Sequence, residues 1–187
     1  MTTRIAGALT GVLLLAACSG AEKADQDAAK PSTETLAAMV AQADDLSTVS
    51  ATLQDAGLAQ VFDGTAAYTL LAPRDAAFTS LGPAGATLQT PEQRPAMVAV
   101  LRDHIVPGYL TPADIKKAIE LDKDGKVAMR TMSGHTLTFT RAADAIIATS
   151  EDGTAVRFAG DALLASNGVA IPVDGLAVDV GGNVQAQ

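Results

Sequence analysis

The sequence predicts an α+β domain, with helices in the first part of the chain and antiparallel strands in the second. Apolar residues recur at helical spacing between residues 36 and 121, and this period is typical of amphipathic helices. From Lys126 apolar and polar residues alternate, which indicates strands with one buried face. Short glycine-containing turn sequences separate these later runs. Helices followed by a meander of antiparallel strands are typical of the α+β class.

One strand is expected early, in the stretch 68–78, whose sequence is Tyr-Thr-Leu-Leu-Ala-Pro-Arg-Asp-Ala-Ala-Phe. Its first five residues are mostly apolar, and Pro73 should end the ladder because proline has no N–H to donate. We expect Asp75 to cap the helix that follows, since a carboxylate accepts hydrogen bonds from the free N–H groups at a helix start. Phe78 then falls on the first apolar turn of that helix and is expected in the core.

Three helical segments are expected before that strand. The first covers about residues 36–43, and either Ser32 or Thr33 could cap it. The second runs to Gly57, because glycine commonly follows the last helical residue. Residues 58–62 form a short helical turn.

Two helices are expected after the strand. Thr90 precedes Pro91, and this order predicts a cap followed by the first helical position. That helix carries an apolar face through residues 97–105 and ends in a histidine, proline and glycine segment. Residues 111–114, Thr-Pro-Ala-Asp, open a second helix through about Leu121.

The later strands are expected in pairs around turns. Asn167-Gly168 is the strongest of these turn signals, because a two-residue hairpin of that kind needs positive φ at both positions. A final strand is expected at residues 176–180. The paired runs are 127–132 with 135–140, 145–149 with 155–159, and 163–166 with 169–171.

The chain divides into a targeting segment, a tether, a domain and a tail. Residues 1–17 combine Arg4 with an apolar run too short to span a bilayer, as in a secretory signal. Cys18 is the only cysteine; it follows Leu-Ala-Ala, and this junction resembles the lipidation signal of bacterial lipoproteins. Read without that resemblance, the junction is an ordinary cleavage site and Cys18 a spare thiol. Residues 18–32 are small and charged and are expected to form a tether. Residues 33–180 are expected to form the domain, and residues 181–187 a disordered tail.

The charge balance limits the partners that the domain can bind. The chain has 13 basic and 21 acidic residues, and removing residues 1–17 takes away only Arg4, so the mature balance is 12 − 21 = −9. An acidic surface without basic runs argues against nucleic acid and against docking on anionic lipid headgroups. Membrane attachment should therefore come from the lipid alone. A single cysteine excludes an internal disulfide.

Three segments in order resemble the signatures of the fasciclin domain: residues 68–78, 101–108 and 165–176. The resemblance covers about residues 33–180. It implies a wedge of antiparallel β-sheet with helices packed along it, and a role in adhesion to matrix proteins, carbohydrates or other cells. Many members have tyrosine before the motif histidine, where this chain has Asp103, so the receptor binding linked to that tyrosine is not expected here. The motif residues of this chain are Pro73, Asp75, Phe78, His104, Asn167, Gly168 and Asp174.

No constellation for catalysis is evident. Asp103 and His104 are adjacent, and neighbours on a helix point about 100° apart, so they do not form a dyad. We expect His104 to hydrogen-bond backbone near the turn at Pro107, leaving contact with a ligand as the alternative. His135 is expected to be exposed, and two isolated histidines do not predict a zinc site.

Nucleophile-elbow, phosphate-loop and dinucleotide motifs are missing from the sequence. Residues 122–125 predict a charged turn rather than a calcium loop. Asp161 and Asp174 are expected to brace backbone at strand ends. No metal, no cofactor and no enzymatic activity are expected.

The sequence therefore favours a non-enzymatic binding or adhesion module, anchored by lipid in the bacterial cell envelope, whose partner is a protein or a glycan. Ser19 after the lipid cysteine resembles the sorting pattern for the outer membrane; whether the domain faces the periplasm or the surface stays open. The alternative is a periplasmic scaffold or small-molecule carrier, which an apolar pocket of several hundred Å³ would favour. The expected interaction patch comprises Asp103, His104, Val106, Pro107 and Tyr109.

Overall fold

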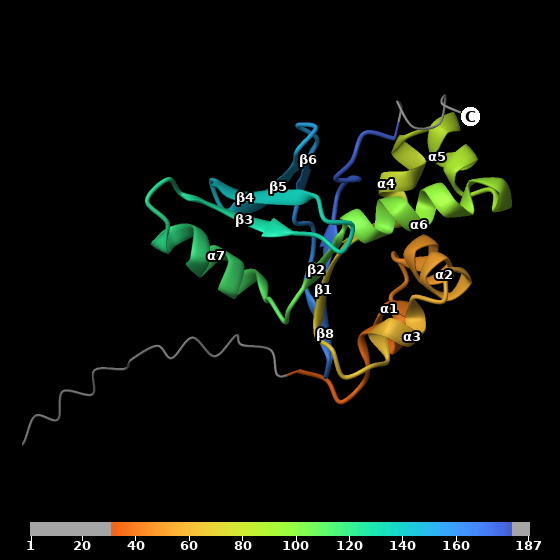
Figure 1. Cartoon of the computed structure of the whole chain (residues 1–187), viewed down its shortest axis with the longest axis horizontal. Helices are drawn as coiled ribbons and strands as arrows, with labels where there is room; N and C mark the ends of the chain where they lie inside the picture. The colour runs from red at the N-terminus through yellow and green to blue at the C-terminus, as the bar shows by residue number, and fades with distance from the viewer. Residues whose placement is uncertain (1–30, 181–187) are drawn as a thin grey trace, which may run out of the picture.

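The computed structural model of the chain describes residues 31–180. The signal segment, Cys18, most of the tether and the tail at 181–187 lie outside the described residues. Within them the expected α+β class and the wedge of sheet and helices are confirmed. Figure 1 shows a central group of strands, β1, β2 and β8, between a helical side formed by α1 to α6 and a second sheet that packs with α7.

The helical side is built from short elements. The structure adds a helix that the sequence did not predict, α5, and it places a turn of 3-10 helix before α6, so that the helix proper begins at Arg94 and not at Pro91. The helices are α1 (Leu36–Gln42), α2 (Ser47–Asp55), α3 (Ala59–Phe62), α4 (Asp75–Ser80), α5 (Pro83–Leu88), η1 (Pro91–Gln93), α6 (Arg94–Asp103) and α7 (Pro112–Leu121).

The strands form two sheets of four. One has the order β2-β1-β8-β7 and contains a parallel pair, β1 with β8; the other is the expected antiparallel meander β3-β4-β5-β6. The short strand β2 was not predicted. The strands are β1 (Tyr68–Pro73), β2 (Ile105–Pro107), β3 (Lys126–Arg130), β4 (Thr136–Ala142), β5 (Ala145–Ser150), β6 (Ala155–Arg157), β7 (Leu163–Leu164) and β8 (Gly168–Val173).

The final strand expected at residues 176–180 is wrong. These residues are irregular, although Leu176, Ala177 and Val180 are buried. They pair with no strand of the two described sheets. The apolar run therefore marks a buried segment that packs through its side chains.

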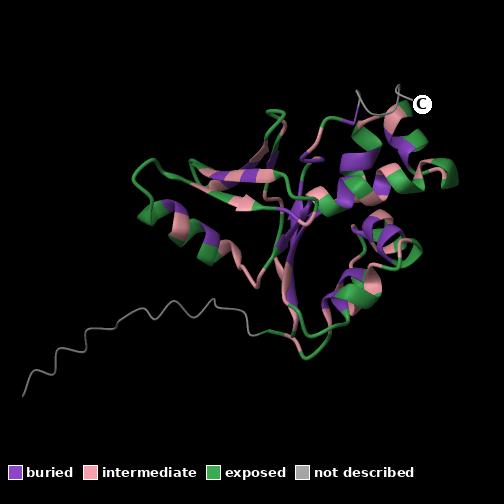
Figure 2. Cartoon of the chain, in the orientation of Figure 1, coloured by how far each residue is buried: buried purple, intermediate pink, exposed green. Residues whose placement is uncertain are grey.

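The central strands separate two apolar cores. Leu70 and Ala72 of β1 pack into the helical core, whereas Leu71 between them packs into the core under the second sheet. Such alternation is expected of a strand covered on both faces. Figure 2 shows this as nearly continuous burial along the central strands. Phe78 is buried in the helical core, as predicted.

Asp75 does not cap its own helix, and that expectation is wrong. It lies in the first turn of α4, but its carboxylate accepts hydrogen bonds from the backbone N–H of Ser47 at 3.1 Å and of Thr48 at 2.8 Å. These are the first residues of α2. Burial alone would raise the pKa of Asp75, but these hydrogen bonds outweigh it and hold the pKa below its usual value. The motif residue thus joins two helices through a long-range cap.

Asn167 and Gly168 lie at a hairpin between β7 and β8, but not in the turn type expected. Neither residue has positive φ. Asn167 instead accepts from the N–H of Leu36 and donates to the carbonyl oxygens of Phe62 and Gly64. A side chain at Gly168 would place Cβ 2.5 Å from the carbonyl oxygen of Tyr68. Glycine is required there for close approach of β1 and β8.

Two other expected caps differ. The cap of α1 is Thr35, whose hydroxyl accepts from Ala38 N, and not Ser32 or Thr33. Thr90 makes no capping hydrogen bond through its side chain. By contrast, Thr111 and Asp114 form a reciprocal capping box at the start of α7, which bears out the helix start expected there.

Candidate functional site

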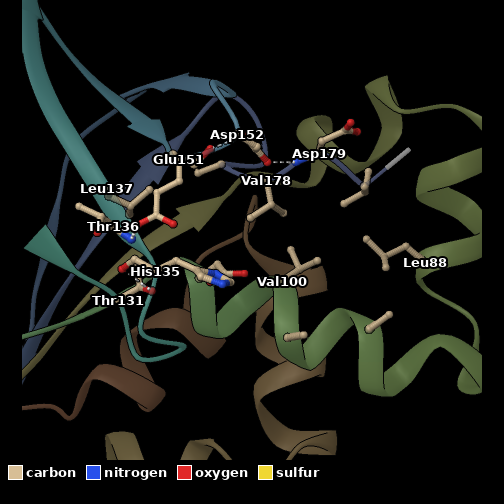
Figure 3. A pocket seen from close by; sticks show the side chains of 16 residues that line it. Leu88, Val100, Thr131, His135, Thr136, Leu137, Glu151, Asp152, Val178 and Asp179 are labelled. Carbon is tan, nitrogen blue, oxygen red and sulfur yellow. Dashed lines mark hydrogen bonds and ion pairs between the residues drawn. The ribbon is translucent and has the colours of Figure 1, made fainter. Parts of the chain in front are cut away.

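A cleft of about 570 Å³ lies between helix α6, one end of the β4–β5 pair and the C-terminal segment 177–180 (Figure 3). Its walls are mostly apolar and its rim carries carboxylates. We call it the acidic cleft. Its acidic members are Asp103, Glu151, Asp152 and Asp179, and its apolar members include Leu88, Val100, Leu137, Val178 and Val180.

Helical and strand spacing explain why these side chains meet. Ala96, Val100 and Asp103 are four and three residues apart on α6, and therefore lie on one face of the helix. Across the cleft, Leu137 pairs directly with Ser150 at the end of the β4–β5 ladder, and Glu151 follows in the turn. The small alanine side chains on α6 leave the space that the cleft occupies.

Asp103 forms a polar cluster with the turn between β3 and β4. His135 Nδ1 lies 2.7 Å from Asp103 Oδ1, and the Ser133 hydroxyl donates to the same oxygen. The side chain of Asp103 is 14% exposed and that of His135 is 64% exposed, so the expectation of an exposed His135 is confirmed. The hydrogen bond and charge of Asp103 raise the pKa of His135 above its ordinary value. The sequence held no local signal for this pairing, because about thirty residues separate its members.

The three residue types of a serine hydrolase are present in this cluster, but their arrangement differs from a catalytic triad. In a triad the carboxylate orients one ring nitrogen of histidine while serine hydrogen-bonds the other. Here Ser133 donates to the carboxylate itself, and its nearest ring nitrogen is Nδ1, at 3.4 Å, which already faces Asp103. The histidine therefore does not activate the hydroxyl in this geometry.

The other carboxylates are held by the backbone around them. Asp152 accepts from the Ser150 hydroxyl at 2.5 Å and from the N–H groups of Thr154 and Asp179 at 2.8 and 2.9 Å. The Ser150 hydroxyl above all, with these N–H groups, holds the pKa of Asp152 far below its usual range. Hydrogen bonding from Thr136 likewise lowers the pKa of Glu151. The rim is therefore negatively charged at neutral pH.

His104 anchors the C-terminal wall of the cleft. It is fully buried, and its Nδ1 donates to the carbonyl of Val100 at 2.7 Å while its Nε2 accepts from the N–H of Ala177 at 2.8 Å. A carbonyl can only accept and an N–H can only donate, so the two contacts select the neutral ring. Burial lowers the pKa of His104 accordingly. His104 does hydrogen-bond backbone, as expected, but the expected location near Pro107 is wrong. The ring bonds Val100 and Ala177 instead.

The structure divides the patch expected at residues 103–109. His104 and Val106 are buried, so their side chains cannot reach a partner. Asp103 faces the acidic cleft, Pro107 is exposed, and Tyr109 is partly buried. The turn at Gly108 is held by the buried Thr69, whose hydroxyl donates to its carbonyl at 2.8 Å.

Two of the remaining acidic candidates act on backbone, whereas the side chain of Asp161 accepts no hydrogen bond within residues 31–180, so the brace expected there is wrong. Asp174 accepts from the N–H of Arg157 at 2.8 Å, as expected for a residue that braces a strand end. Asp122 accepts from the N–H of Asp124 in a turn. Within residues 31–180 no group of three or more histidine, cysteine, aspartate or glutamate side chains is arranged to hold a metal ion. In the same range, no helix has the length and apolar character to cross a membrane.

Comparison with known proteins agrees with this fold. The model of the family described as Fasciclin domain matches residues 44–178, more than half of the chain. This chain belongs to the fasciclin domain family. Protein sll1483 of Synechocystis sp. is 32% identical over 114 residues, which are 60% of this chain and 58% of that protein.

A solved FAS1 domain pair from the insect cell adhesion molecule Fasciclin I matches with a TM-score of 0.67 at 14% identity, over 78% of this chain and 51% of that chain. This likeness shows the fold. The chain spans less than two thirds of the length of either protein. Fasciclin domains are adhesion-type modules and are generally non-catalytic.

Proposed function

We propose that the domain is a non-enzymatic adhesion module of the bacterial envelope, held by lipid on Cys18 and binding a partner protein through the acidic cleft. The observation that supports this proposal is the combination of apolar walls and negative rim in one cleft. It suits a protein segment that carries both basic and apolar side chains. Family membership supports a role in adhesion.

Two carboxylates of the cleft each keep one oxygen that can accept a hydrogen bond from such a partner. Asp103 uses Oδ1 for both Ser133 and His135, and Glu151 uses Oε1 for Thr136. Within residues 31–180, Asp103 Oδ2 and Glu151 Oε2 accept no hydrogen bond. A lysine or arginine could bind these oxygens in charge-assisted hydrogen bonds without displacing an existing one.

Peptides of one length and different charge test the cleft. We expect a lysine–leucine peptide to bind the full chain in mild detergent, and glutamate–leucine and serine–glycine peptides not to bind, as measured by fluorescence anisotropy. Ala99→Trp, which fills the cleft from α6, should weaken binding by about tenfold or more, equivalent to about 1.4 kcal/mol. Ala76→Trp, at an exposed position of α4 outside the cleft, is the matched control. The proposal would be contradicted if all three peptides bound equally, or if the lysine–leucine peptide did not bind.

Two measurements test the lipid anchor and the cellular location of the domain. Metabolic labelling with radioactive palmitate should mark the wild-type chain and not Cys18→Ser, and membrane fractionation should release the variant. Antibody labelling of intact and permeabilised cells then separates a surface adhesin from a periplasmic component. Palmitate on the Cys18→Ser chain would rule out this anchor.

The volume of the cleft favours a second candidate function, a periplasmic carrier of a small cationic molecule. About 570 Å³ falls within the range of ligand pockets, roughly 300–1,000 Å³. Native mass spectrometry of protein purified from its own cells discriminates the two functions. A carrier retains a small molecule that Ala99→Trp loses, whereas an adhesion module retains none.

A further inference from the structure

A second cleft, of about 590 Å³, lies at the opposite end of the β4–β5 pair. Leu137 lines the acidic cleft and Arg141 lines this one, four residues further along β4, or about 14 Å in an extended strand. The start of α7, the β4–β5 turn and β6 surround it. We call it the basic cleft; its charged members are Lys116, Arg141, Arg157 and Asp144.

The basic cleft has the opposite charge to the chain as a whole. Three cations and one carboxylate give its lining a net charge of 3 − 1 = +2, whereas the chain has 13 basic and 21 acidic residues. The single carboxylate, Asp144, is fully exposed and lies 3.8 Å from Arg141. It therefore offsets little of the positive charge, whereas Glu120, which is outside the lining, pairs with Arg141 at 3.1 Å.

Two of the three cationic side chains of the basic cleft are free to bind a ligand. Among residues 31–180, the side chains of Lys116 and Arg157 make no hydrogen bond or ion pair. Arg141 is held in place instead: its Nη1 lies 3.1 Å from Glu120 Oε1, and its Nε donates to the carbonyl of Ala143 at 2.9 Å. The cleft thus combines one positioned guanidinium with two free cations.

The floor of the cleft is apolar and includes an aromatic ring. Ile146 and Ile171 are buried, and Phe158 is partly buried with its ring edge-on to Phe139 at 6.2 Å between centroids. An aromatic and aliphatic floor packs against the C–H face of a sugar ring, while charged groups at the rim bind its substituents.

We propose that the basic cleft binds an acidic polysaccharide, a sugar chain with carboxylate groups on successive rings. The two free cations come from different elements, Lys116 from α7 and Arg157 from β6, so each can bind a carboxylate of a different ring. Arg157, with a free planar guanidinium, can bind a carboxylate through two parallel hydrogen bonds. This inference rests on the proposed binding function and adds to it a second ligand of another class.

The test measures binding of hexagalacturonate to the full chain in mild detergent by isothermal titration calorimetry. Neutral maltohexaose and hexaglutamate are the comparison probes. We expect hexagalacturonate to bind, to bind more weakly as salt is raised, and to exceed both other probes. The double variant K116S/R157S should lose about tenfold or more in affinity, since each cation makes a charge-assisted contact.

The control double variant, R102S/K117S, removes the same net charge from exposed positions outside the basic cleft, and we expect it to bind hexagalacturonate like the wild type. Equal losses in both double variants would show a general charge effect and overturn the inference. Equal binding of hexaglutamate would overturn the assignment to sugars, and no binding of hexagalacturonate would overturn the site. Binding of the lysine–leucine peptide to K116S/R157S separates this failure from failure of the proposed function, because that peptide uses the acidic cleft.

Discussion

The acidic and basic clefts have similar volumes, about 570 and 590 Å³, and share the β4–β5 pair, but they hold their charges in different ways. In the acidic cleft, Asp152 and Glu151 accept hydrogen bonds from backbone N–H groups, and His104 fixes the wall at Ala177. In the basic cleft, Lys116 and Arg157 make no such contacts with the part of the chain that the structure describes.

The difference teaches that the carboxylates of the acidic cleft also stabilise the fold, whereas Lys116 and Arg157 of the basic cleft supply charge without holding other parts of the chain. Carboxylates that satisfy backbone donors contribute to stability as well as to surface charge. Solvated cations contribute charge at little cost or benefit to folding. Substitutions of Asp152 or His104, which hold backbone around the acidic cleft, should therefore disturb stability and binding together. Substitutions of Lys116 or Arg157 in the basic cleft should disturb binding alone.

The largest effect is expected for His104→Ala. The change leaves the buried N–H of Ala177 without a partner and opens a cavity, so we expect the free energy of unfolding to fall by about 3 kcal/mol. Hydrogen exchange should rise at residues 176–180, and binding at the acidic cleft should weaken. His135→Ala, at the exposed histidine, should leave the urea midpoint nearly unchanged. A stable His104→Ala variant with protected residues 176–180 would refute the anchoring role.

A smaller effect is expected for Asp152→Ala, which removes the acceptor shared by Thr154 and Asp179. Because the side chain is largely exposed, the loss of unfolding free energy should be about 1 kcal/mol. The folded pKa is lowered, so this contribution is complete above the unfolded pKa, about 3.9, and is lost as pH falls toward the folded value.

The matched substitution in the basic cleft, Arg157→Ala, should change the free energy of unfolding by no more than about 0.5 kcal/mol. Urea unfolding of both variants at pH 7 measures this difference. Equal destabilisation by the two would end the distinction between the clefts.

The smallest effect concerns the protonation of His135. Asp103 raises its pKa, with smaller contributions from Glu151 and Asp152, so Asp103→Asn should lower it toward about 6.5. The folded pKa lies above the unfolded one; the stabilisation is therefore present below about 6.5 and is lost as pH rises through the folded value. NMR titration of the His135 ring measures this shift. An unchanged pKa in Asp103→Asn would show that the pair does not form in solution, and Glu151→Gln, with a smaller decrease, is the comparison.

Local patterns predicted most of the elements. The strand at residues 68–72, the capping box of Thr111 and Asp114, and the alternation after Lys126 each depend on residues close in sequence, and each is found in the structure. The missed elements are short. Helix α5 has six residues and β2 three, too few for a period to emerge from the sequence.

The partners of side chains were harder to predict. Asp75 and Asn167 carry the right chemistry for capping and turns, but the groups they bind come from α2, from α1, and from the end of α3 and the turn after it. The cluster of Asp103 and His135 and both clefts depend on the same kind of contact. Sequence motifs identified Asp75 and Asn167 without identifying the backbone groups that they bind.

The sequence by itself determined the α+β class, the family, the buried Phe78 and the acidic balance, because periodicity, composition and short motifs are properties of neighbouring residues. Only the tertiary structure decided that His104 is a buried anchor, that Asp75 caps a distant helix, and that charges of opposite sign gather at the two ends of β4 and β5. Those outcomes depend on how the helical layer and the second sheet pack on the central strands, which brings together residues from 27 to 131 positions apart.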